Sequence, residues 1–363
     1  MHSPTAFTRQ PLTAKRALTL IGVVAVVAVL AACSGRGQTA TTANANGKFT
    51  TVTIVAPATE SDHGWNQMGL KGAANAAKAT GLKLTADSNV GYDNTETILT
   101  QAAQKPGVGF VIAHASGFGK AADHANEKTG VPMLVTDFPA AQKKGKIGVI
   151  TFSAQQGGYL AGIAAAMTTK TDKIGIAVSA EDINWFTMSG GFVAGARSVN
   201  PAIHVDVAYI GAAAYDDSAG GKKVVQQLIA SGDDIIFGMG DGATIGYVAA
   251  VDEANQAGIS VKYIADIGDV SDLVTKSDEV LTSVLWVFDG AYEAAIKDIK
   301  GGTFATAPYD LNLKNGGIKL QETTGLTSEI KAAVKKATAG IDDGSIDVPN
   351  TSTKDALTAL LNK

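Results

Sequence analysis

Short apolar runs alternate with longer alanine-rich segments along most of the chain. The apolar runs lie at residues 51–56, 82–87, 109–113, 131–135, 173–178, 234–237 and 261–265. Segments with helical spacing follow the first three runs, at residues 67–80, 95–104 and 120–129. This alternation is typical of βαβ units with a parallel sheet. The runs lack a clean polar face, so helices are expected on both faces of the sheets.

The N-terminus has a different pattern. Arg9, Lys15 and Arg16 precede an almost unbroken apolar run at residues 17–32, which ends at Cys33. The run is shorter than the roughly 20 residues of a comfortable membrane span and ends in small residues, which indicates a secretory signal peptide over residues 1–32. The stretch before Cys33 is similar to a lipobox, so we expect Cys33 to be lipidated and to begin the mature chain.

The single cysteine limits the chemistry of the mature protein. Cys33 is the only cysteine in the sequence. Once it is lipidated, no disulfide, cysteine-based zinc site or thiol catalysis remains available. Residues 33–48 are rich in Thr, Ala, Asn and Gly, and this composition predicts a flexible tether to the membrane.

Size and charge narrow the class further. Roughly 315 residues follow the tether, more than one hydrophobic core usually supports, so we expect two lobes. Removal of the leader leaves 27 Lys and Arg against 34 Asp and Glu. A net negative charge disfavours nucleic acid as a partner.

Aromatic and acidic residues gather where the predicted strands end. Ligands of open parallel sheets bind outside the carboxyl ends of the strands. The candidate binding residues found there are Trp65, Asn66, Phe118, Trp185, Phe186, Asp241, Asp266 and Trp286. All three tryptophans of the chain belong to this set, which favours a ligand cleft in which aromatic rings stack and polar groups select.

Trp65, His114 and two similar glycine-rich phrases also have structural interpretations. Trp65 could pack under its loop while Ser61 or Asp62 caps the following helix. His114 could be a base or a structural residue. The similar phrases at residues 157–162 and 190–195 place small residues where a helix could lie close to its sheet, which indicates packing rather than function.

A dinucleotide-binding enzyme is the main alternative from another class. Residues 238–243 fit the form G-x-G-x-x-A after a predicted strand. However, the motif occurs late in the chain, and Asp241 would place negative charge beside a pyrophosphate. The sequence contains no G-x-S-x-G or H-E-x-x-H motif, so we expect no catalytic site, no metal site and no cofactor.

Several segments together resemble the basic membrane protein family of ABC-importer receptors, which includes purine nucleoside receptor lipoproteins. The resemblance spans residues 51–303 and rests on residues 62–66, 158–162, 191–201, 233–237 and 280–284. It implies an α/β type I periplasmic binding protein with two Rossmann-like lobes and a three-strand hinge near Ser153, Val284 and Ala307. The lobes would comprise residues 49–153 with 285–307, and residues 154–284 with 308–363.

The same resemblance assigns roles to single residues. In nucleoside-binding relatives an aromatic and an Asn after the first strand hold the base, matching Trp65 and Asn66. Either Trp185 or Phe186 would supply the second aromatic. Asp266 matches an Asp that holds the ribose, whereas Trp286 stands where those relatives carry a ribose-binding Lys. The free purine base is therefore expected to bind better than its nucleoside.

These observations predict a lipoprotein on the extracytoplasmic face of the cell membrane. It would bind a purine base or nucleoside, or alternatively a sugar, and deliver it to the permease subunits of an ABC importer. We expect it to act as a monomer and not as an enzyme.

Overall fold

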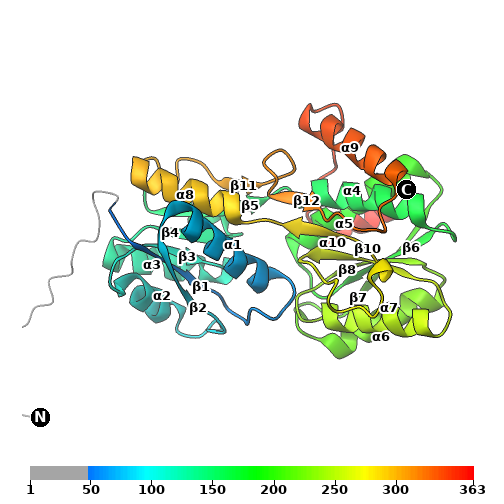
Figure 1. Cartoon of the computed structure of the whole chain (residues 1–363), viewed down its shortest axis with the longest axis horizontal. Coiled ribbons are helices and arrows are strands. Elements are labelled where there is room, and N and C mark those ends of the chain that lie inside the picture. The colour runs from blue at the N-terminus through cyan, green and yellow to red at the C-terminus, as the bar shows by residue number, and fades with distance from the viewer. Residues whose placement is uncertain (1–47) are drawn as a thin grey trace, which may run out of the picture. The chain divides into compact units, whose positions relative to one another are not determined.

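The computed structural model describes residues 48–363. The predicted signal peptide, most of the predicted tether and Cys33 lie outside the described residues. The described residues form two six-stranded sheets, each with helices on both faces (Figure 1). The inner strands of both sheets are almost entirely buried, which explains why their sequences are mostly continuous apolar runs, whereas the strands at the sheet edges are partly exposed.

The first sheet is wholly parallel, with strand order β11-β5-β4-β3-β1-β2. Its strands are β1 (Thr51–Val55), β2 (Lys83–Asp87), β3 (Val108–Ala113), β4 (Met133–Thr136), β5 (Ile147–Phe152) and β11 (Tyr309–Leu311). Its helices are α1 (Trp65–Thr80), α2 (Thr95–Gln104), α3 (Gly119–Thr129) and α8 (Asp289–Gly301), with short 3₁₀ turns at Ser116–Phe118 and Pro139–Ala141. We call this sheet and its helices the first lobe.

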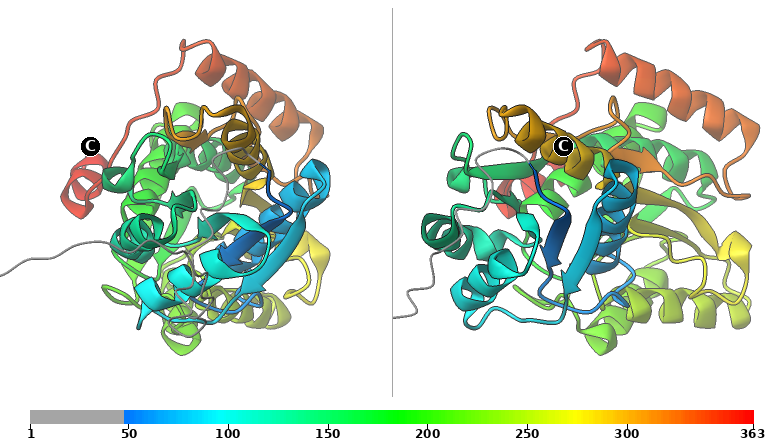
Figure 2. Two further views of the ribbon diagram at one scale, coloured as in Figure 1. Left: turned by 90° about the vertical axis from the view of Figure 1, so that its left-hand side faces the viewer. Right: turned by 60° about the vertical axis from the view of Figure 1, so that its left-hand side comes forward.

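The second sheet has the order β12-β10-β9-β8-β6-β7, in which only β12 runs antiparallel to its neighbour. Its strands are β6 (Lys173–Val178), β7 (His204–Tyr209), β8 (Ile235–Met239), β9 (Lys262–Ile267), β10 (Val280–Trp286) and β12 (Ile318–Leu320). Its helices are α4 (Ala154–Thr168), α5 (Ile183–Val199), α6 (Ser218–Ala230), α7 (Thr244–Gln256), α9 (Ser328–Asp342) and α10 (Lys354–Leu361), with a 3₁₀ turn at Ser277–Glu279. This second lobe carries α9 over α4, as Figure 2 shows.

The chain passes between the lobes three times. The crossings follow β5, β10 and β11, which end at Phe152, Trp286 and Leu311. Asp310 joins two of them, because its carboxylate accepts hydrogen bonds from Thr151 Oγ1 (2.9 Å), Ser153 Oγ (2.8 Å) and Asn312 Nδ2 (2.9 Å).

The two similar glycine phrases pack against each other. A Cβ placed on Gly158 or Gly162 of α4 would lie 2.1 Å from a carbonyl oxygen of α5, and one on Gly191 or Gly195 of α5 would lie 2.1 or 2.0 Å from a carbonyl oxygen of α4. The interpretation as packing is therefore confirmed, although the close contact joins two helices rather than a helix and its sheet.

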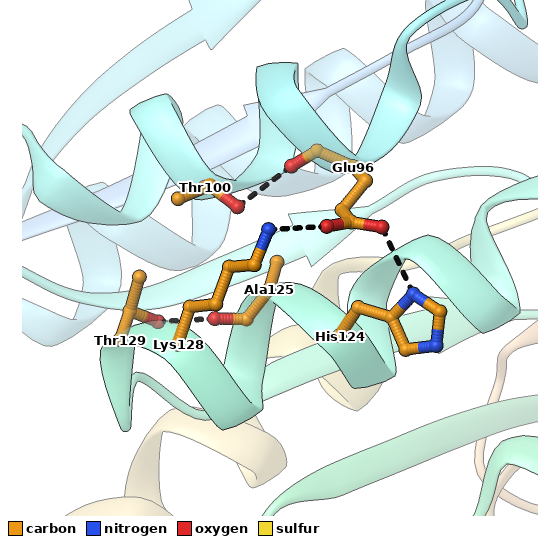
Figure 3. Close-up of polar contacts among 6 residues, drawn as sticks. All are labelled: Glu96, Thr100, His124, Ala125, Lys128 and Thr129. Carbon is orange, nitrogen blue, oxygen red and sulfur yellow. Dashed lines mark hydrogen bonds and ion pairs between the residues drawn. The ribbon is translucent and has the colours of Figure 1, made fainter. Parts of the chain in front are cut away.

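Helices α2 and α3 are joined at the surface through Glu96. Its carboxylate accepts hydrogen bonds from Lys128 Nζ and from His124 Nδ1, the latter at 2.9 Å (Figure 3). Such exposed ion pairs contribute little to the free energy of folding, about 0–1 kcal/mol, so the two helices are held together mainly by the buried alanines between them.

Within residues 48–363, no helix is both long and apolar enough to span a membrane.

Candidate ligand-binding site

A cavity of about 360 Å³ lies between the lobes, where the carboxyl ends of both sets of strands converge. This volume is near the lower end for small-molecule sites, roughly 300–1,000 Å³. The first lobe contributes Pro57, Ala58, Trp65, Asn66, Asn89, Tyr92, Ala115, Ser116 and Asp137 to its wall. The second contributes Asp182, Asn184, Trp185, Tyr215, Asp216, Asp241, Ile267 and Trp286.

Trp65 is the first residue of α1 and lines the cavity with a partly exposed side chain. One face of its indole stacks on the His114 ring, with centroids 4.8 Å apart and an interplanar angle of 26°. Its Nε1–H donates to the His114 carbonyl oxygen at 3.0 Å. Three further rings, those of Phe152, Trp286 and Phe288, meet the indole at steeper angles, with centroids 5.7, 6.1 and 5.8 Å away. A ligand can therefore contact only the part of the ring that borders the cavity, which we call its cavity-side face.

Asp62 builds the start of α1 and holds Asn66. Its carboxylate accepts hydrogen bonds from the backbone N–H of Gly64, Asn66 and Gln67 (3.2, 2.7 and 2.9 Å) and from Asn66 Nδ2 (2.8 Å). Capping by Asp62 is therefore confirmed. Asn66 Oδ1 also accepts from the N–H of Ala58 at 3.3 Å, which leaves one Nδ2 hydrogen of Asn66 for a ligand.

Trp286 closes the hinge side of the cavity. Its ring stacks on Phe152 of β5, with centroids 4.4 Å apart, and meets Trp65 edge-on at 6.1 Å. The residue is 1% exposed, and its Nε1–H has no hydrogen-bond partner among the described residues. An unpaired buried donor costs about 1–3 kcal/mol, so this N–H lowers the stability of the folded protein.

Trp185 and two tyrosines complete the aromatic wall. Trp185 lies 5.3 Å from Tyr215 between ring centroids, and both line the cavity from the second lobe. Tyr92 faces it from the first lobe. Of the two proposed partners for Trp65, the structure thus places Trp185 at the cavity and Phe186 beside Tyr209, away from its wall.

Four carboxyl groups, those of Asp137, Asp182, Asp216 and Asp241, also line the cavity, and its described wall contains no Lys, Arg or His. Burial, and after it the charge of Asp182, raises the pKa of Asp137 to about 7. Burial followed by the charge of Asp62 raises the pKa of Asp241 to about 8. The cavity therefore favours neutral or positively charged ligands with several hydrogen-bond donors.

We expect the ligand-free protein to become more stable as the pH falls from 8 to 5. Asp137 and Asp241 have pKa values near 7 and 8 in the folded state but about 3.9 when unfolded. The folded state then binds more protons in this range, so its stability falls as pH rises. Melting temperatures measured at constant ionic strength test this. Asp137→Asn and Asp241→Asn should each flatten the slope, and a slope unchanged in both variants would contradict the assignment.

Two direct hydrogen bonds join the lobes at the cavity. Asn184 Nδ2 donates to Asp137 Oδ2 at 2.9 Å, and the N–H of Trp65 donates to Asp241 Oδ1 at 3.4 Å. Both bonds link residues of the cavity wall, so they form only when the lobes are closed.

Three predicted site residues lie outside the cavity wall. Phe118 is fully buried beneath Tyr92, 5.6 Å away between centroids. Phe186 is buried in the core of the second lobe. Asp266 lies behind the loop that carries Asp241, where it accepts from the N–H of Gly240 at 3.4 Å, and burial raises its pKa well above the usual range. It can support that loop, but the described cavity does not reach it.

Several wall residues were missed by the sequence analysis: Asn89, Tyr92, Ser116, Asp137, Asp182, Asn184, Tyr215, Asp216 and Ile267. Most follow a strand end, which is the signal that could have found them. Asp137 and Ile267 also have a positive φ of 59°. This conformation is unusual for a β-branched residue such as Ile267, and strained backbone of this kind is often found at functional sites.

Among residues 48–363, no group of three or more potential metal ligands is clustered.

Comparison with known proteins agrees with this architecture. Residues 49–351 match the family described as ABC transporter substrate-binding protein PnrA-like. The chain is 31% identical to an ABC transporter nucleoside-binding protein of Lactococcus lactis, over 90% of this chain and 96% of that protein. It is 25% identical to the transcriptional activator protein med of Bacillus subtilis, over 82% of this chain and 89% of that protein.

The predicted fold is confirmed by solved structures. A solute-binding protein of an ABC transporter system from Aeropyrum pernix has a TM-score of 0.72 at 18% identity, covering 86% of this chain and 96% of that one. Another from Conexibacter woesei has a TM-score of 0.70 at 19% identity, covering 84% and 99%. Together with the family match, which confirms the resemblance found in the sequence, these findings show that the chain belongs to the PnrA-like family of ABC transporter substrate-binding proteins.

Proposed function

We propose that this protein is the extracytoplasmic, lipid-anchored receptor of an ABC importer and that it binds a purine base or nucleoside between its lobes. One observation carries the ligand class: the cavity-side face of a tryptophan that stacks on His114 borders a cavity whose described wall has carboxyl groups and no basic side chain. A purine is flat enough to stack on that face, where stacking contributes about 1–3 kcal/mol per base.

The polar groups of the wall suit the edges of a purine. Amino groups and ring N–H groups of the ligand can donate to Asp137, Asp182 and Asp241, which face the cavity from both lobes. Closure of the lobes excludes water from these groups, so a ligand that leaves one unpaired loses about 1–3 kcal/mol.

A panel of ligands tests the proposal. The leaderless protein is screened by thermal shift with adenine, guanine, hypoxanthine, their nucleosides, adenosine 5′-monophosphate, NAD, D-ribose and D-glucose. At a hundredfold excess over Kd, a ligand stabilises the folded state by about 2.7 kcal/mol, which is several degrees for a protein of this size. We expect purines to raise the melting temperature and the monophosphate and NAD to have no effect, because their phosphates meet only carboxyl groups.

A sugar receptor is the second candidate. Carboxylate and amide side chains beside aromatic rings can also hold sugar hydroxyls, and Asn89, Asn184 and the four Asp side chains provide such groups here. Stabilisation by free D-ribose or D-glucose without any effect of purines would replace the proposed ligand. Stabilisation by NAD alone would instead favour the dinucleotide-binding alternative.

Lipid anchoring is tested at Cys33, which lies outside the described residues. We expect Cys33→Ser to release the protein from the membrane, because the single acylated residue is the only proposed anchor. Carbonate-washed membranes and culture medium from cells that express each form are compared by immunoblot. Continued retention of the variant on washed membranes would show that something other than Cys33 holds the protein there.

A further inference from the structure

His114 follows β3 and makes three different contacts with one residue, Trp65. The imidazole stacks on the indole at 4.8 Å, and the His114 carbonyl accepts the indole Nε1–H at 3.0 Å. Its Nε2 lies 2.9 Å from the Trp65 carbonyl oxygen. His114 itself is fully buried, so these contacts hold the cavity-lining tryptophan from behind.

The hydrogen bonds determine the tautomer of His114. The Trp65 carbonyl can only accept, so Nε2 carries the hydrogen. Nδ1 is then an acceptor, and the hydroxyl of Tyr292 on α8 donates to it at 3.0 Å. Burial lowers the pKa of His114 to about 4, so the imidazole is neutral at ordinary pH and each of its nitrogens has a suitable partner.

Neighbouring residues pack closely around the His114 ring on several sides. A Cβ on Gly69 of α1 would lie 2.1 Å from His114 Nε2, so glycine is required where the imidazole approaches the helix. On another side, Phe288 meets the ring edge-on at 5.0 Å and stacks on Tyr292 at 5.6 Å. The imidazole therefore has a single orientation, fixed by α1, β3 and α8.

We propose that His114 is a positioning residue: held by Tyr292, it fixes the plane of the Trp65 indole so that the cavity-side face is presented to the ligand. The inference rests on the proposed function, in which a flat ligand stacks on that face. A preorganised ring loses less conformational entropy when the ligand binds. We call the side chains of His114 and Tyr292 the clamp. Substitutions in the clamp should therefore weaken stacking without removing any group that the ligand touches.

The variant Tyr292→Phe is the smallest substitution that tests this proposal, because it removes one hydroxyl and keeps the aromatic ring. His114→Phe keeps a ring beside the indole but removes both side-chain hydrogen bonds, and His114→Gln keeps a donor for the Trp65 carbonyl. Tyr263→Phe is the matched control, since Tyr263 is equally buried in the second lobe and its hydroxyl has no partner among the described residues.

Two measurements are made on the leaderless protein. Fluorine NMR of 5-fluorotryptophan-labelled protein gives three indole signals, which Trp65→Phe, Trp185→Phe and Trp286→Phe assign. Calorimetry with adenine and adenosine gives Kd. We expect Tyr292→Phe and His114→Phe to shift or broaden the Trp65 signal, to leave the Trp185 signal in place and to weaken binding roughly 2- to 10-fold. His114→Gln should have a smaller effect than His114→Phe, and Tyr263→Phe should change neither signal nor affinity.

The results separate this inference from the proposed ligand. If Tyr292→Phe and His114→Phe both leave the Trp65 signal unchanged, His114 does not position the indole. A changed signal with unchanged affinity would likewise overturn the role in binding. If neither adenine nor adenosine binds the unmodified protein, the proposed ligand is wrong, and the Trp65 signal alone then decides whether the clamp exists.

Discussion

Trp65→Ala should weaken purine binding about 5- to 150-fold. Loss of one base–aromatic stack costs roughly 1–3 kcal/mol, which corresponds to this range at 25 °C. The substitution also leaves the His114 carbonyl without the indole donor that it has at 3.0 Å. Calorimetry with adenine and adenosine gives the change in Kd.

Trp65→Phe is the matched control for that experiment. It retains an aromatic face but has no N–H, so affinity should fall much less than in Trp65→Ala. An equal loss in both variants would indicate that the indole N–H, rather than the stacking face, supports binding. Unchanged affinity in Trp65→Ala would place the ligand elsewhere.

Trp286→Ala should change the preference between free base and nucleoside by tenfold or more. The indole fills the hinge end of the cavity against Phe152, so the unmodified protein should bind adenine better than adenosine. Truncation removes packing around the base and opens space for a ribose. Titration of adenine, adenosine, guanine and guanosine into both proteins measures the preference directly.

The substitution also affects folding, because Trp286 is one of the largest fully buried side chains. Trp→Ala changes in cores cost about 3–5 kcal/mol, so stability must be measured alongside affinity. Trp286→Phe keeps most of the volume and removes only the unpartnered N–H. A preference for nucleoside over base in the unmodified protein would refute the role given to Trp286.

The sequence predicted the fold well because its strands are continuous apolar runs separated by helical segments. Parallel strands of this kind end on the same edge of their sheet, so Trp65, Trp185, Asp241 and Trp286 could be assigned to one cavity before any coordinates.

The remaining wall residues could not be predicted, since tertiary packing decides which of several loop side chains faces the cavity. The loop around Phe118 illustrates this. A Cβ on Gly119 would meet Phe138 at 2.1 Å, and one on Gly117 would meet Tyr92 at 2.8 Å. The glycines thus admit neighbouring side chains, and Tyr92 covers Phe118, which the sequence analysis placed among the candidate binding residues.

Asp137 shows a second limit of sequence reasoning. A single aspartate after a strand is common and usually solvated. Only the fold brings it beside Asn184 and Asp182 of the other lobe, and only then does burial change its chemistry.

The backbone contact between α4 and α5 has a consequence for mutational tolerance. At Gly158, Gly162, Gly191 and Gly195, any side chain would place its first carbon about 2 Å from a carbonyl oxygen of the facing helix. No rotamer can relieve this overlap, because the position of Cβ is set by the backbone itself. A substitution could be accommodated only by moving two whole helices apart. In a saturation library, these four positions would consequently form two spaced pairs that accept a single amino acid.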